Sequence, residues 1–189
     1  MAEPSPVAET CPKCGGRGWV VVGDGGAGTA RRCECFKRDL GPALLARSGV
    51  PERYRECRLS RFDTAHHLPG ARGQLLQARA SCESYVDGFL RTDGSFVSTG
   101  LLFYGPPGAG KTHLAVSVLN ELISRYRVGG RFVDFTSLIH KIQSTFDPGS
   151  MESKREVLDP VMNVPFLIID ELGAQKPTPW VQDILYLII

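Results

Sequence analysis

Residues 101–115, LLFYGPPGAGKTHLA, determine how the rest of the chain is interpreted. The stretch opens with an apolar run, and GLLFYG at 100–105 predicts a short buried strand. A Gly/Pro-rich loop follows, and then an apolar pattern with a helical period begins. That pattern predicts a helix from Lys111 to about Tyr126. Its apolar members are Leu114, Ala115, Val118, Leu119, Leu122, Ile123 and Tyr126.

The loop fits the pattern G-x-x-x-x-G-K-[ST] without a mismatch. Its residues are Gly105, Pro106, Pro107, Gly108, Ala109, Gly110, Lys111 and Thr112. Glycines let successive backbone N–H groups turn toward phosphate oxygens, and the start of the helix adds further free donors. Lys111 can reach the β- and γ-phosphates, and the Thr112 hydroxyl can ligate Mg²⁺. We therefore predict a nucleoside triphosphate site, with His113 among its residues and packed behind the loop.

A second motif, FLIIDEL at 166–172, supplies two acidic side chains at the end of an apolar run. The run predicts a strand buried on both faces, and ligands of open α/β sheets bind at the carboxyl ends of strands. We assign Asp170 to Mg²⁺, directly or through a water, and Glu171 to polarising the water that attacks the γ-phosphate. Lys111, Asp170 and Glu171 are thus the predicted catalytic residues. The Asp-Glu pair favours an ATPase, and no Asn-Lys-x-Asp guanine-reading signature follows the loop.

Strand-like and helix-like patterns alternate along the rest of the chain. The strand-like runs are RFVDF at 131–135 and PFLIID at 165–170, and the helix-like periods lie at 72–91, around 138–146 and at 178–189. Such alternation predicts a parallel sheet flanked by helices, an α/β fold of the P-loop NTPase kind. A short helix is also expected at 42–48, stopped by Gly49 and Pro51.

Four of the six cysteines lie near the N-terminus in two close pairs, Cys11 with Cys14 and Cys33 with Cys35. Four thiolates in two such pairs can surround one tetrahedral Zn²⁺. Residues 1–38 therefore predict a small zinc-binding module, followed by a linker at 39–70 and the ATPase core at 71–189. We read Cys57 and Cys82 as small core residues.

The chain has 189 residues, 42% of them apolar, and a net charge of +2, which is typical of a globular protein. The polar start and the lack of a long apolar run predict no secretory signal and no membrane span, so we expect a cytoplasmic protein. Basic and aromatic residues surround the cysteine pairs. They are Trp19, Arg31, Arg32, Phe36, Lys37 and Arg38. This composition is compatible with nucleic-acid binding and, equally, with a solvated face around a protein-docking module.

Three stretches, YGPPGAGKTHLA, LIIDELGAQ and SGVPERYRECRLSRFD, resemble AAA+ ATPases of the bacterial replicative-helicase loader group, the DnaC/DnaI type. They are similar also to the IstB-type ATPase subunits of transposition systems. The N-terminal cysteine pairs look like those of loader relatives that carry a zinc module. The resemblance covers most of the chain.

The resemblance implies a helicase loader in DNA replication that assembles into homo-oligomers, binds ATP at subunit junctions and acts on a ring-shaped replicative helicase. It also implies single-stranded DNA as a partner, with residues 136–160 toward the DNA and Lys141, Lys154 and Arg155 as candidate contacts. Two alternatives remain open. One is a transposition helper ATPase, and the other is a zinc-dependent nucleic-acid-binding module in which the ATPase domain is a scaffold.

The resemblance also implies elements after the acidic motif, namely a polar sensor strand, an arginine finger, a fifth strand and a helical lid. This sequence stops at DILYLII, residues 183–189. We therefore expect a C-terminally truncated AAA+ core, and we expect the chain by itself to bind nucleotide at best weakly and to hydrolyse almost no ATP.

Overall fold

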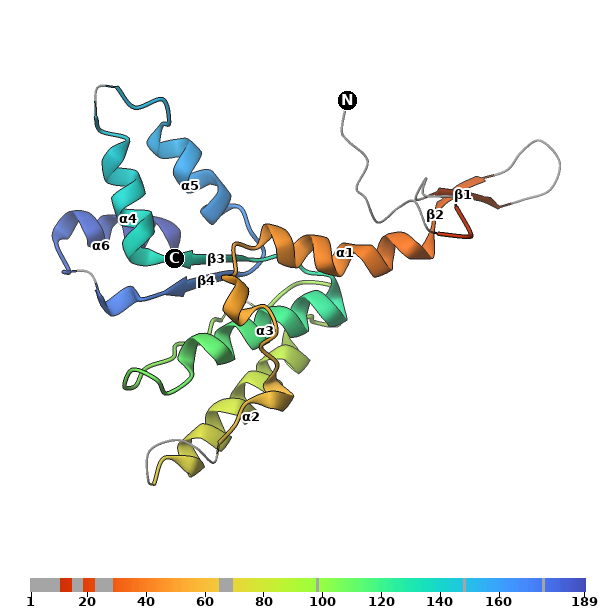
Figure 1. Ribbon diagram of the computed structural model, residues 1–189, viewed down its shortest axis with the longest axis horizontal. Helices are drawn as coiled ribbons and strands as arrows, with labels where there is room; N and C mark the ends of the chain where they lie inside the picture. Colours follow the sequence, from red (N-terminus) through yellow and green to blue (C-terminus); the bar gives the residue numbers. More distant parts are fainter. Residues whose placement is uncertain are drawn as a thin grey trace. The chain divides into compact units, whose positions relative to one another are not determined.

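The computed structural model describes residues 11–14, 19–22, 29–64, 70–97, 99–147, 149–174 and 176–189 (Figure 1). The chain divides into two compact units, Met1–Leu44 and Leu45–Ile189. Residues 1–10, 15–18 and 23–28 of the expected module and residues 65–69 of the expected linker lie outside the described residues. From Leu45 onward, the expected linker belongs to the second unit. Its short 3₁₀ helices Glu52–Tyr54 and Leu59–Arg61 contact the helix that follows the phosphate loop.

The first unit contains a β-hairpin followed by a helix. β1 (Trp19–Val22) pairs antiparallel with β2 (Thr29–Arg32). α1 (Glu34–Arg47) begins between the two cysteines of the second pair. The helix starts well before the predicted 42–48. Its first turn carries the acidic Glu34, which the helix dipole favours, and no Gly or Pro interrupts the sequence before Gly41. The predicted stop is confirmed, because α1 ends before Gly49, whose φ is +75°.

Two predicted strands form the parallel sheet of the second unit. β3 (Arg131–Asp134) pairs with β4 (Leu167–Asp170), and Asp134 lies opposite Asp170. Of the β4 residues only Ile168 is buried. The expectation that this strand is buried on both faces is therefore wrong. Within the described part of the chain, no helix is both long and apolar enough to span a membrane.

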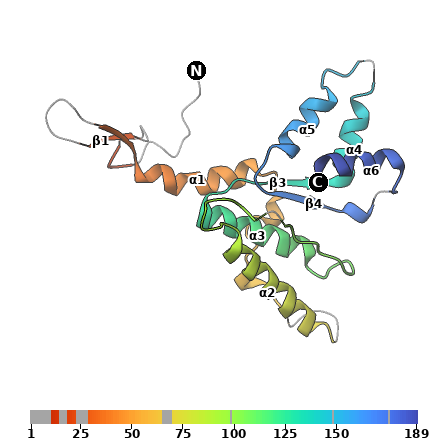
Figure 2. The ribbon, with the colours of Figure 1, turned by 180° about the vertical axis from the view of Figure 1, so that it is seen from behind.

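Three helices cluster around β3 and β4 in both ribbon views (Figures 1 and 2). They are α4 (Phe135–Ser144), α5 (Lys154–Met162) and α6 (Pro179–Ile188). Their apolar faces form one core with the sheet. The helices near 138–146 and 178–189 are confirmed, whereas α5 was not predicted. The sequence does contain a signal for α5, the capping box formed by Ser153 and Glu156. Each of these side chains accepts a hydrogen bond from the other residue's backbone N–H.

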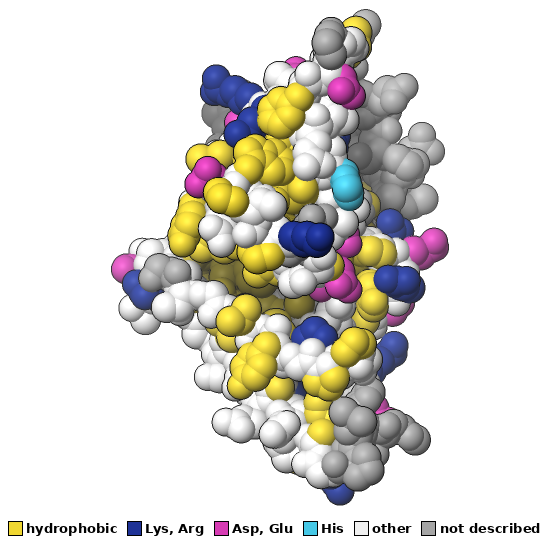
Figure 3. All heavy atoms as spheres, turned by 90° about the vertical axis from the view of Figure 1, so that its left-hand side faces the viewer, with side chains coloured by type: hydrophobic (Ala, Val, Ile, Leu, Met, Phe, Trp, Pro, Cys, Tyr) yellow, Lys and Arg dark blue, Asp and Glu magenta, His cyan; other side chains and the backbone are white. Residues whose placement is uncertain are grey.

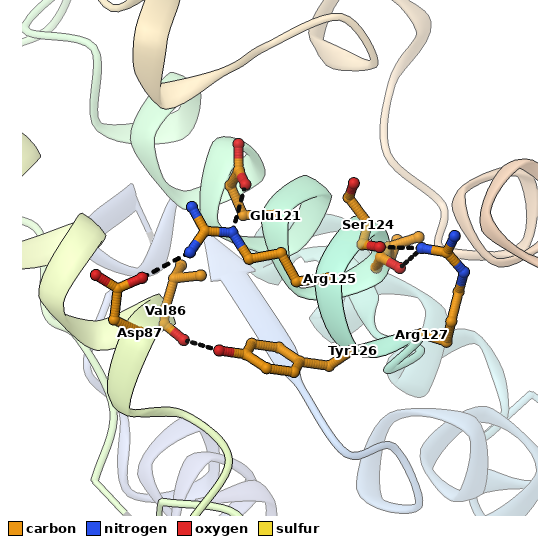
Figure 4. Close-up of polar contacts among 8 residues, drawn as sticks. Val86, Asp87, Glu121, Ser124, Arg125, Tyr126 and Arg127 are labelled. Atoms are coloured by element: carbon orange, nitrogen blue, oxygen red, sulfur yellow. Dashed lines mark hydrogen bonds and ion pairs between the residues drawn. The ribbon is translucent and has the colours of Figure 1, made fainter.

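Two further helices, α2 (Arg72–Gly88) and α3 (Lys111–Tyr126), pack side by side and share a second core. Both were predicted, and the bounds of α3 agree with the expectation. Figure 4 shows the polar contacts at one end of the pair, where Arg125 donates to Asp87 at 2.6 Å and Tyr126 donates to the Val86 carbonyl at 3.0 Å. The Arg125–Asp87 ion pair is exposed, and such pairs contribute only about 0–1 kcal/mol. Apolar burial, including Cys82 and Val86, therefore holds α2 to α3.

The predicted strand at 100–105 is wrong. Residues 101–104 carry no strand conformation, and the side chains of Leu102 and Tyr104 are 80% and 91% exposed. A strand needs a neighbour for its backbone N–H and C=O groups, and an apolar run does not supply one. A cavity of about 1150 Å³ is lined on one side by Leu101–Phe103 and on another by β4. In the described residues this segment therefore has no strand ladder to join.

Candidate nucleotide-binding site and metal centre

The phosphate loop has the backbone shape that its sequence predicts. Gly108 and Gly110 have φ values of +79° and +84°, a region that glycine enters without steric cost. Gly110 is also the N-cap of α3, so the free N–H groups of the first helical turn follow the loop directly. A Cβ at Gly110 would lie 2.6 Å from Cε2 of Phe62. The position therefore needs glycine for its backbone angle and for space.

Lys111 and Thr112, the last two residues of the motif, make different contacts. The Lys111 ammonium donates to the carbonyls of Gly105 and Pro106, both at 3.0 Å, so its charge lies over the loop. The Thr112 hydroxyl lies 3.0 and 3.2 Å from the two carboxylate oxygens of Asp170. This contact joins the start of α3 to the carboxyl end of β4, residues far apart in sequence. A hydroxyl and a carboxylate at this separation are hard oxygen donors of the kind Mg²⁺ prefers.

Glu171 occupies the position after Asp170 and is exposed. Its φ is +56°, a left-handed backbone that costs a non-glycine residue roughly 1–2 kcal/mol. Backbone strain of this kind often occurs at functional sites, where the surrounding structure holds it in place. Glu171 lines the same cavity as Lys111, Thr112 and Asp170.

Figure 3 shows a hollow on one face of the molecule, with hydrophobic side chains around it and Lys/Arg and Asp/Glu side chains beside it. The cavity of about 1150 Å³ combines the phosphate loop, the acidic pair and apolar walls from Phe89 and Phe103. Charged groups of opposite sign thus meet next to an apolar surface, which suits a ligand with charged phosphates and an apolar base.

The segment before α2 supports the loop from behind. His113 lies as predicted, with its Nε2 3.3 Å from the Arg58 carbonyl and its ring 5.4 Å from that of Phe62. Further along α3, the Asn120 amide donates to the carbonyls of Arg55 and Cys57 at 3.1 and 2.8 Å. We did not predict the roles of Phe62 and Asn120. No local pattern signals them, since each contact joins residues distant in sequence.

The four N-terminal cysteines meet as the sequence predicts. Their sulfur atoms all lie within 4.8 Å of one another and all four side chains are buried. The Cys11–Cys33 and Cys14–Cys35 sulfur distances are 3.7 and 3.5 Å. Four sulfurs at 2.3 Å from one zinc ion would be about 3.8 Å apart, so the set fits a tetrahedral Zn²⁺.

The pKa values of two of these thiols, Cys11 and Cys35, are shifted in opposite directions. Backbone N–H groups of Cys14 and Lys13 lower the pKa of Cys11 to about 6. Burial, together with hydrogen bonds to neighbouring thiols, raises the pKa of Cys35. None of the six cysteines of the chain forms a disulfide. Cys57 and Cys82, in the second unit, are buried as predicted.

Comparison with known proteins agrees with this geometry. The family of IstB-like ATP binding proteins matches residues 90–186. The replicative helicase loader DnaC of Buchnera aphidicola subsp. Baizongia pistaciae is 33% identical over 135 residues, which are 70% of this chain and 49% of that protein. DnaC of Escherichia coli K12 is 29% identical over 143 residues, covering 76% and 53%. The chain spans about half the length of the curated relatives it matches.

A solved structure gives the same answer for the fold. The crystal structure of the DnaC helicase loader superposes with a TM-score of 0.55 and 30% identity, covering 74% of this chain and 71% of that one. Its likeness and the parallel β3–β4 pair identify an incomplete P-loop fold of helices and parallel sheet, with a four-cysteine cluster before it. The predicted family is therefore confirmed: the chain belongs to the IstB-like ATP-binding protein family.

Proposed function

We propose that the protein is an ATP-hydrolysing helicase loader, which delivers a ring-shaped replicative helicase to single-stranded DNA. The observation that carries the ATPase part is the pair of contacts between Thr112 and Asp170 at 3.0 and 3.2 Å. These contacts bring the hydroxyl of the phosphate loop and the acid of β4 to one point beside Lys111. The loader part is supported by the relatives that are named replicative helicase loaders.

Each residue of the site has one task in this proposal. Backbone N–H groups of the loop and the Lys111 ammonium bind the β- and γ-phosphate oxygens. Thr112 and Asp170 would hold Mg²⁺, which would neutralise charge on those oxygens. Glu171 accepts the proton of the attacking water, and its exposed position at the end of β4 leaves room for that water.

The chain's own contacts bear on the proposed partners. Lys141 pairs with Glu152 at 2.9 Å and Arg155 with Asp159 at 3.4 Å. Both pairs are largely exposed, so their net contribution is small and DNA phosphates could replace the carboxylates. Homo-oligomers with ATP at the subunit junctions follow from the resemblance to loaders and belong to the same proposal.

We also propose that Cys11, Cys14, Cys33 and Cys35 hold one structural Zn²⁺. Their close sulfur distances and their burial support it. Four thiolates complete the coordination of zinc and leave no position for a substrate, so the ion would stabilise the hairpin unit and take no part in catalysis.

The nucleotide site is tested with a fluorescent ATP analogue and the full chain. Wild type should bind it in the presence of Mg²⁺, and Lys111→Ala should lose at least tenfold in affinity, since a charged hydrogen bond contributes about 1.5–3 kcal/mol. Equal binding by the two proteins would refute the site. ATP turnover is measured separately, so that a loss of hydrolysis is distinguished from a loss of binding.

The partner is tested by capture on immobilised chain. Purified replicative helicase should be retained, and Lys111→Ala should change the nucleotide dependence of that retention. Retention of a transposase in place of the helicase would refute the loader and assign the transposition alternative.

A further inference from the structure

The hairpin of the first unit has two chemically different faces. Residues directly opposite in an antiparallel pair share a face, and successive residues alternate. The register places Val20 opposite Arg31 and Trp19 opposite Arg32. Val20 packs against the four-cysteine cluster, so its face is directed to the thiols. Trp19 and Arg32 therefore lie together on the opposite face, away from the cluster.

This second face is aromatic, basic and accessible. The Trp19 side chain is 51% exposed, although a small unit would ordinarily bury so large a ring. The Arg32 guanidinium lies 5.3 Å from the centre of the indole, in the range of a cation–π contact. An Arg plane and an indole side by side offer both partners that an unpaired nucleotide needs, a π-face for the base and a cation for the phosphate.

Size and charge decide between a nucleic acid and a protein as occupant. A strand of four residues is only about 13 Å long, whereas a stable protein–protein interface uses about 20–30 residues a side. One or two nucleotides fit a face of that length. Residues 11–38 carry six Lys and Arg against two acidic residues, and the sum stays positive when four thiolates and one Zn²⁺ are included, which is complementary to phosphate. Glu34, one of the two acids, is paired with Lys13.

We propose that the Trp19–Arg32 face of the hairpin binds single-stranded nucleic acid without sequence specificity. A base stacks on the exposed part of the Trp19 indole, and the Arg32 guanidinium contacts the adjoining phosphate. The site is separate from the nucleotide site and does not depend on ATP hydrolysis, but it rests on the zinc site that holds the hairpin. It adds a nucleic-acid contact to the N-terminal unit itself.

The experiment titrates a fluorescein-labelled oligothymidylate with the zinc-loaded full chain and follows anisotropy. Trp19→Ala should bind about 5- to 150-fold more weakly, which is the range measured for one stacked base, and Trp19→Phe should recover most of the affinity. Arg32→Ala should weaken binding, and the slope of log affinity against log salt concentration should become smaller by about 1, as expected for the loss of one phosphate contact. Arg31→Ala is the matched control, because it removes the same charge from the neighbouring residue on the other face.

A second readout reports stacking directly. Trp19 and Trp180 are the chain's two tryptophans, so in a Trp180→Phe background the emission comes from Trp19, and the oligothymidylate should quench it. Zinc content is measured for each variant, so that loss of the hairpin is not mistaken for loss of the contact. The proposal is overturned if Trp19→Ala binds like wild type, if Arg31→Ala and Arg32→Ala have equal effects, or if binding leaves Trp19 unquenched. Loss of ATP-analogue binding by Lys111→Ala with no effect of Trp19→Ala would overturn this proposal and leave the nucleotide site standing.

Discussion

Replacing Gly110 with alanine tests how the phosphate loop is held. The substitution places a non-glycine residue at φ +84°, which costs roughly 1–2 kcal/mol. It also puts a methyl carbon 2.6 Å from Cε2 of Phe62. That ring is 5% exposed and rigid, so either the ring or the loop must shift, at about 1–3 kcal/mol. We expect a total loss of about 2–5 kcal/mol in unfolding free energy, or weaker nucleotide binding where the loop yields instead.

Gly108→Ala is the matched control. Its φ of +79° imposes nearly the same backbone strain, but nothing lies within 4 Å of the added carbon. The difference between the two variants in urea unfolding therefore isolates the overlap with Phe62. In the double variant Gly110→Ala with Phe62→Ala, the loss of unfolding free energy should be smaller than the sum of the two single losses. The difference, which is the coupling energy, should be about 1–3 kcal/mol. Equal losses for Gly108→Ala and Gly110→Ala, together with additivity in the double variant, would refute the claim that Phe62 supports the loop.

Three other changes probe the remaining contacts. Asp170→Asn keeps the shape of the side chain and removes its charge, so ATP-analogue binding should lose its Mg²⁺ dependence while binding in EDTA is unchanged; retained Mg²⁺ dependence would contradict the assignment. Asn120→Ala leaves the carbonyls of Arg55 and Cys57 without their donor, and urea unfolding should show a loss of about 1–3 kcal/mol, whereas a neutral result would mean that solvent replaces the amide. Cys33→Ser should abolish the zinc that a colorimetric chelator releases from purified wild type, and wild type free of zinc would remove the metal site.

The phosphate loop and the acidic pair could be predicted because each motif consists of residues that are contiguous in the sequence. Glycines, one lysine and one threonine at fixed spacing define the loop, and an apolar run ending in Asp170 defines the partner strand. The bounds of α3 were predictable for the same reason, since its apolar face and its glycine N-cap are both local. The four-cysteine cluster was predictable from two close pairs, whereas no local pattern specifies the register of the hairpin between them.

Other features depend on partners that a local pattern does not specify. The run at 100–105 is as apolar as β4, yet only β4 lies beside a hydrogen-bonded neighbour, β3. No local pattern distinguishes Phe62 from other aromatic residues of a connecting region. Its role follows from the fold, in which Gly110 at the start of α3 lies against its ring. The predicted helix start at Pro42 is wrong, because α1 begins at Glu34 and accommodates that proline inside the helix. For the run at 100–105 and for Phe62, contacts between distant residues decided the outcome.

The site is consequently held more firmly on one side than on the other. Behind the loop, Phe62 and the His113 contact to the Arg58 carbonyl fix the start of α3, and Thr112 ties that start to Asp170. Before the loop, the described residues 101–104 join no strand, and Tyr104 is almost fully exposed. The residues that would hold Mg²⁺ are therefore already in place, whereas the entry to the loop has no ladder to resist movement. Nucleotide binding should on this basis move the segment 101–105 far more than α3, because Lys111 must release the carbonyls of Gly105 and Pro106 to reach a phosphate.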